Sequence, residues 1–142
     1  MIPPSDYYGY GIQISGKYDN NTWIGMNNIK GEWWVAYHGI GKEKRNDEVK
    51  EIIGKIMNEG LKPGDNQAYE DDDNYNELSN AEYSKVGIGV YWSDKIETTV
   101  YYAGKIEIEY ENDIKEYYTL MMCRVNLEKT RFSDEGIFCI KS

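Results

Sequence analysis

The chain contains little cysteine and histidine, and it has no long apolar run. Its 142 residues include two cysteines, Cys123 and Cys139, and a single histidine, His38. Two cysteines are too few for a disulfide framework, and together with one histidine they lack the spacing of zinc ligands. No apolar run approaches the ~20 residues needed to cross a bilayer. We therefore expect neither a metal site nor a membrane partner.

Basic residues are also scarce. Lys and Arg together number 16 against 25 for Asp and Glu, which gives a formal net charge of -9. Binding to nucleic acid depends on clustered basic side chains that neutralise phosphates, so the charge argues against a nucleic-acid partner. The first residues, MIPPSDYYGYG, have neither the basic end nor the apolar centre of a signal peptide. An intracellular protein, cytoplasmic by default, is the expectation.

The remaining pattern predicts one α+β domain over residues 1–142, with more strands than helices. Residues 8–18 alternate like a strand, and GEWWVAYHG (31–39) favours a buried or half-buried strand. From residue 86 onward, VGIGVYW, YYTLMMCRV and GIFCIK are apolar runs of strand length. Between them, TTVYYAGKIEIEYEN combines a short turn of helix with an alternating strand. Mostly antiparallel sheets with one covered face account for both kinds of strand.

One main helix is predicted over residues 47–59. Its apolar residues fall at the spacing of a single face that would pack on a sheet: Val49, Ile52, Ile53, Ile56 and Met57. Asn46 or Asp47 can cap its start, and Gly60 suits the left-handed position past its end. The acidic segment that follows, 65–83, is predicted to be an exposed loop. Its Asp71, Asp72 and Asp73 do not have the spacing of a calcium-binding EF-hand.

Several familiar sites are excluded by single residues. A dinucleotide-binding glycine motif would need a third glycine where GIGVYW has Trp92 and GYGIQI has Ile14. GIGKEK would be a phosphate-binding loop only with Ser or Thr in place of Glu43. A protease pairing His38 with Cys123 or Cys139 is disfavoured because both cysteines lie in apolar strands, where thiols are usually buried and inert.

Three segments nevertheless occur in a distinctive order. YHG (37–39) ends a strand, EGL (59–61) ends the helix, and GIGVY (87–91) starts a later strand. Thr99 follows Tyr91 by eight residues, and Tyr102 follows it by eleven. Over residues 33–125 this order resembles the catalytic domain of the poly(ADP-ribose) polymerase-like ADP-ribosyltransferases. Residues 1–30 lie outside the resemblance and could be an edge strand with a turn or an acceptor-recognition element.

The resemblance implies an ADP-ribosyltransferase fold, in which NAD lies in a cleft between two small, mostly antiparallel sheets. It further implies a mono-ADP-ribosyltransferase that moves ADP-ribose from NAD to a protein acceptor and releases nicotinamide. By this likeness, Gly39 would offer backbone groups to the nicotinamide carboxamide, and Thr99 would donate to the same amide. Tyr102 would stack on the ring, with Tyr91 on its other side or edge. His38 would hold ribose hydroxyls.

The resemblance also calls for a glutamate just before a closing apolar strand, where it stabilises the transition state. SDEGIFCI places Glu135 there, with Asp134 as the alternative. His38, Tyr91 and Glu135 would then be the catalytic residues. The short connector between CRVNLEK and SDEGIFCI departs from the polymerases, which have a long insertion there, and predicts transfer of single ADP-ribose units. An inactive relative that binds NAD, ADP-ribose or a protein partner through the same cleft remains the alternative.

Overall fold

The computed structural model describes residues 9, 11–12, 15–16, 20–65, 67–78 and 85–140, without the side chains of 138–140. The chain divides into two compact units, residues 1–32 and 33–142. In the first unit, the 3-10 helix η1 (Asn21–Ile24) begins where the Asn20 side chain accepts a hydrogen bond from Thr22 N, and it buries Trp23. The strand predicted over 8–18 lies largely outside the described residues.

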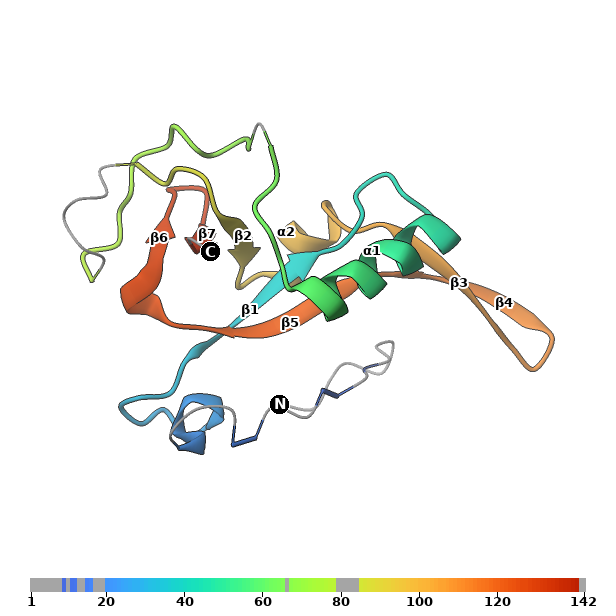
Figure 1. Cartoon of the computed structure of the whole chain (residues 1–142), viewed down its shortest axis with the longest axis horizontal. Coiled ribbons are helices and arrows are strands. Elements are labelled where there is room, and N and C mark those ends of the chain that lie inside the picture. The colour runs from blue at the N-terminus through green and yellow to red at the C-terminus, as the bar shows by residue number, and fades with distance from the viewer. Residues whose placement is uncertain are drawn as a thin grey trace. The chain divides into compact units, whose positions relative to one another are not determined.

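The second unit is built on a five-stranded sheet in the order β5–β1–β2–β7–β6 (Figure 1). Every pairing in it is antiparallel. The strands are β1 (Trp34–Gly39), β2 (Val90–Ser93), β5 (Leu120–Val125), β6 (Thr130–Phe132) and β7 (Ile137–Ile140). This confirms the predicted α+β class with antiparallel sheets. The three-residue β6 was missed because so short a run has no readable alternation.

Strand pairing is shortest in the middle of this sheet, between β1 and β2. Strand β1 pairs with β5 along its whole length, from Trp34↔Val125 to Gly39↔Leu120. With β2 it shares a single pair, Tyr37↔Ser93. The sheet therefore consists of two halves, β5–β1 and β2–β7–β6, that are joined by one residue pair.

The core of the sheet is small and lies where these halves meet. Ala36, Val90, Trp92 and Val125 form the buried cluster, and Leu61, Cys123 and Phe132 pack against it. Ala36 and Val125 are at most 1% exposed, so this part of the sheet is held by apolar burial. The cluster fixes the ends of β1 and β2 from which the site described below is built.

Helix α1 (Asn46–Glu59) confirms the predicted helix and part of its packing. Gly60 follows it with a φ of 81°, and its N–H bonds Ile56 O at 2.9 Å, as expected of the residue past a helix end. The predicted cap was wrong. Arg45 is the N-cap and makes no side-chain capping bond, while Asn46 Oδ1 accepts from Glu107 N at 2.9 Å. Val49 is fully buried, but Met57 is 54% exposed, because the sheet against which the apolar face of α1 packs is only two strands wide.

The packing partner of α1 is a two-stranded hairpin, β3 (Lys105–Tyr110) and β4 (Asp113–Tyr118), which forms a separate sheet. Figure 1 shows it projecting from the five-stranded sheet, with α1 beside β3. Glu111 and Asn112 form its turn with φ values of 50° and 64°, the signs that a tight hairpin turn of this kind requires. The alternating strand β3 was predicted, whereas β4 was not, because Glu-Asn is a weak turn signal compared with Asn-Gly.

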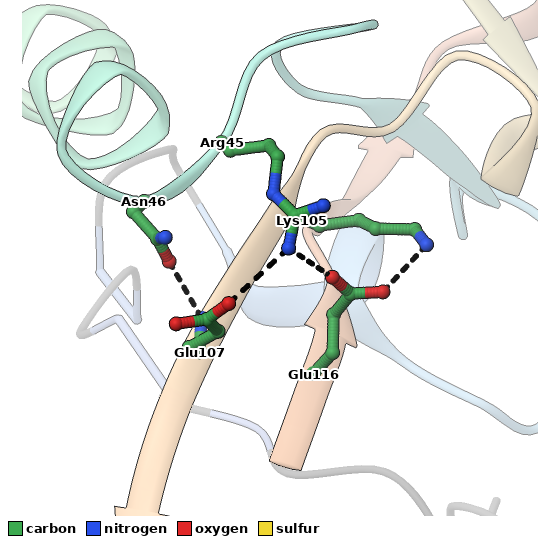
Figure 2. Close-up of polar contacts among 5 residues, drawn as sticks. All are labelled: Arg45, Asn46, Lys105, Glu107 and Glu116. Carbon is green, nitrogen blue, oxygen red and sulfur yellow. Dashed lines mark hydrogen bonds and ion pairs between the residues drawn. The ribbon is translucent and has the colours of Figure 1, made fainter. Parts of the chain in front are cut away.

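A polar network attaches this hairpin to the start of α1 (Figure 2). Arg45 Nη2 donates to Glu107 Oε1 at 3.2 Å and to Glu116 Oε2 at 2.5 Å. Lys105 Nζ donates to the other oxygen of Glu116, also at 2.5 Å. The hydrogen bond from Lys105 lowers the pKa of Glu116. Together with the Asn46 bond, these contacts hold both hairpin strands to one end of the helix.

The acidic segment after α1 is more firmly attached than a solvated loop. Val86 N bonds Asp72 O and Gly87 N bonds Glu70 O, so the segment runs beside the start of the GIGVY stretch. Asn76 is buried and donates to Leu127 O and Thr130 O. The prediction of an exposed loop was therefore wrong for these positions, although Asp71 and Asp73 are exposed as expected. Backbone partners supplied from distant strands decide the conformation here.

Candidate functional site

A cavity of about 280 Å³ lies where β1 and β2 separate. Its walls come from the ends of these strands, from helix α2 (Ile96–Val100) with the residues after it, and from the segment that follows α1. The lining includes five of the six residues that sequence analysis placed in a site: His38, Gly39, Tyr91, Thr99 and Tyr102. Segments that are distant in the sequence thus supply one cavity.

His38 connects the two strands across this gap. Its Nδ1 lies 2.7 Å from Tyr91 O. A carbonyl oxygen can only accept, so Nδ1 carries the proton and donates it. Burial lowers the pKa of His38, which favours the neutral ring. In the neutral form Nε2 then carries a lone pair and can accept a hydrogen bond.

Gly39 exposes its backbone to the same gap. Ile40 N bonds Thr119 O on the β5 side, and backbone groups alternate sides along a strand. The N–H and C=O of Gly39 therefore face the β2 side, one step past the Tyr37↔Ser93 pair. A Cβ at this position would lie 2.6 Å from Thr99 O and 2.7 Å from Tyr102 C, so glycine is also what allows α2 to approach β1. The close packing therefore requires glycine here.

Tyr91 is held by the loop that precedes it. Its hydroxyl donates to Gly87 O at 2.7 Å. Gly87 has a φ of 68°, which favours glycine, and the buried guanidinium of Arg131 lies against it and donates to Ile88 O. The glycines of GIGVY thus form a turn that orients the tyrosine ring, rather than a phosphate-binding loop.

Helix α2 places Thr99 and Tyr102 on the opposite wall. Thr99 is buried, and its hydroxyl donates to Lys95 O at 3.0 Å. Its proton is therefore used within the helix, and its lone pairs are what it can offer a ligand, whereas sequence analysis expected a donor. Tyr102 lies just beyond the helix, and burial together with its hydrogen bond to Tyr69 raises its pKa to about 12. Its hydroxyl is neutral at physiological pH.

The wall formed by the segment after α1 was not predicted from the sequence. Gln67 is clamped to Gly89, since its Nε2 donates to Gly89 O at 2.6 Å and its Oε1 accepts from Gly89 N at 2.9 Å. Two residues later, Tyr69 lies 2.7 Å from Tyr102 through their hydroxyl oxygens and 6.0 Å from Tyr91 between ring centroids. Tyr69 is one of three tyrosines in an acidic, polar stretch that has no periodicity, so no signal in the sequence pointed to it.

Glu135 is the predicted site residue that does not line the cavity. It lies with Asp134 in the turn between β6 and β7, and both side chains are exposed. Two residues further on, Ile137 pairs with Ser93 and does line the cavity. The structure therefore places Glu135 near the end of β2 but outside the cavity wall.

Thiol chemistry at Cys123 is disfavoured. Burial raises the pKa of the Cys123 thiol to about 11, which keeps it protonated and poorly nucleophilic. Within the described ranges, no group of three or more His, Cys, Asp or Glu side chains could hold a metal ion. Of the helices in that same part of the chain, none has the length and apolar character that crossing a bilayer requires.

The fold and site define a small α+β protein whose antiparallel sheet opens into an aromatic cavity beside its single histidine. Comparisons of the chain with models of protein families, with curated proteins and with solved structures gave no match.

Proposed function

We propose that the cavity binds NAD and that the protein is a mono-ADP-ribosyltransferase of the poly(ADP-ribose) polymerase-like class. The observation that carries this proposal is the meeting of His38, Gly39, Tyr91, Thr99 and Tyr102 around one cavity. These residues were chosen from motif order alone, and they come from stretches of the chain, 38–39, 91 and 99–102, that meet only in the folded protein. The single-pair junction between β1 and β2 also supports the cleft that such an enzyme needs.

The groups that line the cavity suit the nicotinamide end of NAD. The N–H and C=O of Gly39 can pair with a planar carboxamide, and Thr99 can accept from its amino group. Tyr102 and Tyr91 offer ring faces for stacking on the aromatic ring. Neutral His38 can accept a hydrogen bond from a ribose hydroxyl. A cavity of about 280 Å³ lies at the lower limit for small-molecule sites, ~300 Å³, so it would hold one end of a dinucleotide, with the rest outside.

The proposed reaction breaks the bond between ribose C1′ and the pyridinium nitrogen. The electron pair of that bond stays with the nitrogen, so nicotinamide leaves as a neutral molecule. An acceptor side chain forms the new bond to C1′ and loses its proton to solvent. The residues around the cavity hold the leaving group flat, and Glu135 stabilises the positive charge that develops on the ribose.

One observation favours a second candidate, an inactive relative that binds the same ligand. Glu135 and Asp134 are both exposed and lie outside the cavity wall. If neither carboxylate reaches the bound ribose, NAD or ADP-ribose would be held without transfer. The two candidates share the binding site and differ only in whether a carboxylate, from Glu135 or Asp134, reaches the bound ribose.

The experiment that separates them combines NAD-induced thermal stabilisation with an assay for nicotinamide release, using water or added polypeptide as acceptor. The active candidate predicts stabilisation by NAD and measurable release. Glu135→Gln should slow release by ~10²–10³ while leaving stabilisation in place, and Asp134→Asn is the matched control. Stabilisation without release by the unchanged protein would favour the inactive relative. If the unchanged protein shows no stabilisation by NAD and no release of nicotinamide, the NAD proposal is rejected.

A further inference from the structure

Lys42 is the one charged residue among the described residues that line the cavity, since His38 is neutral. It lies three residues past Gly39, in the loop between β1 and α1, and its side chain is exposed at the rim. Its Nζ stands 4.2 Å from the ring centroid of Tyr101 and 5.0 Å from that of Tyr102. The ammonium group is thus held at the mouth of the cavity by two aromatic rings.

The neighbouring cations form ion pairs with carboxylates, whereas Lys42 does not. Lys44 pairs with Glu48, and Arg45 pairs with Glu107 and Glu116. Among the ion pairs of the described residues, none includes Lys42. Its charge remains available to a ligand that enters beside it.

The charge of the whole protein makes this local cation important. A net charge of -9 disfavours any phosphate-bearing ligand at long range. Salt screens exposed charges beyond about 10 Å at 0.1 M, so the charge nearest the mouth dominates what an entering ligand meets. The cavity is also too small for a whole dinucleotide, so the part beyond the nicotinamide end must extend out of the cavity across its rim.

We propose that Lys42 binds the diphosphate of NAD at the mouth of the cavity and so determines specificity for the dinucleotide over nicotinamide alone. This rests on the proposed function, because it assumes that the nicotinamide end enters the cavity. The contact is a charge-assisted hydrogen bond from the ammonium group to phosphate oxygens. The rings of Tyr101 and Tyr102 keep that group at the rim before the ligand arrives.

The test measures the affinity of NAD and of nicotinamide for the full chain at 50 and 200 mM salt, in the unchanged protein and in Lys42→Met, Lys42→Arg and Lys44→Met. We expect Lys42→Met to weaken NAD binding about tenfold or more and to reduce its salt dependence, with nicotinamide binding unchanged. Lys42→Arg should retain most of the NAD affinity. Lys44→Met is the control, since it removes an exposed cation that does not line the cavity.

The possible failures are distinguishable. If the unchanged protein binds NAD and Lys42→Met binds it equally well, the role of Lys42 is rejected and the NAD site stands. If Lys42→Met weakens NAD and nicotinamide alike, Lys42 acts by supporting Tyr102, and the diphosphate contact is rejected. If the unchanged protein binds neither ligand, the proposed function falls and this inference falls with it.

Discussion

The hydroxyl oxygens of Tyr69 and Tyr102 lie 2.7 Å apart, and their hydrogen bond joins the segment after α1 to the second residue past α2. Tyr69 comes from a wall that Gln67 clamps to Gly89, and Tyr102 from the wall that carries Thr99. The bond therefore fixes the orientation of the Tyr102 ring from across the cavity. Holding the ring in one orientation beforehand lowers the ordering cost of stacking a ligand on it.

Tyr69→Phe should weaken NAD binding several-fold without unfolding the protein. The substitution keeps the ring near Tyr91 but removes the hydrogen bond, and one such bond contributes about 0.5–1.5 kcal/mol. The pKa of Tyr102, about 12 in the unchanged protein, should fall but stay above 10, because burial is the larger cause of its shift. Carbon-13 NMR of labelled tyrosine, titrated to high pH, measures this directly.

The control for this change is Tyr75→Phe. Tyr75 belongs to the same segment but is 60% exposed and does not line the cavity. It should leave both NAD affinity and the Tyr102 titration unaltered. Equal effects of the two variants would mean that Tyr69 has no specific role at the site.

Acidification should destabilise the protein through His38. Burial holds the pKa of this residue below its usual 6.5, so the unfolded chain binds the proton more tightly than the folded one. The stability contributed by neutral His38 is then fully present above pH 6.5 and decreases as pH falls below it. Melting temperatures from pH 7.5 to 5.5 measure this, and His38→Asn, whose amide nitrogen can replace the Nδ1 donor, should show a flatter profile. If the melting temperatures of the two proteins fell equally with pH, His38 would not be the group responsible for the loss of stability.

Gly39→Ala should destabilise the second unit by about 1–3 kcal/mol or more, because its Cβ would overlap the backbone of α2. Gly54→Ala is the matched control, since Gly54 lies within α1 and a Cβ there would meet nothing within 4 Å. That change should stabilise the helix by about 1 kcal/mol. Urea unfolding measures both variants. Equal effects of the two alanines would show that α2 does not approach β1 as closely as the structure indicates.

Arg45→Met should loosen the β3–β4 hairpin. Arg45 joins Glu107 and Glu116, one residue from each strand, to the start of α1 (Figure 2). Amide hydrogen exchange should therefore become faster in the hairpin, while exchange in β1 and β5 stays unchanged. The control is Lys55→Met, which removes only the exposed pair with Glu51 on α1. Unchanged exchange in the hairpin would mean that its other contacts with this part of the chain, such as the bond between Asn46 Oδ1 and Glu107 N, hold it without Arg45.

Much of the fold follows from local patterns in the sequence. The apolar run ending at Gly39 became β1, the helical spacing from Val49 became α1, and the alternation after Gly104 became β3. Each of these signals comes from neighbouring side chains that share one face. The coarse class was therefore predictable from the sequence.

The features that could not be predicted from the sequence depend on distant partners. Asn46 bonds the hairpin instead of capping α1, and buried Asn76 donates hydrogen bonds to carbonyl groups more than fifty residues away. Tyr69 becomes part of the cavity because Gln67 is clamped to Gly89. Such contacts exist only after the chain folds, so composition and periodicity contain no sign of them. The motif order predicted the cavity residues from β1, β2 and α2, and it missed the wall after α1.

The most direct test of the account is an NMR titration of the single imidazole with NAD. Because His38 is the one histidine in the chain, its ring signals need no assignment among several. If NAD binds in the cavity and a ribose hydroxyl donates to Nε2, these signals should move and saturate as NAD is added, and Lys42→Met should require more NAD for the same change. Imidazole signals that stay fixed up to millimolar NAD, in a protein shown to be folded, would contradict the account.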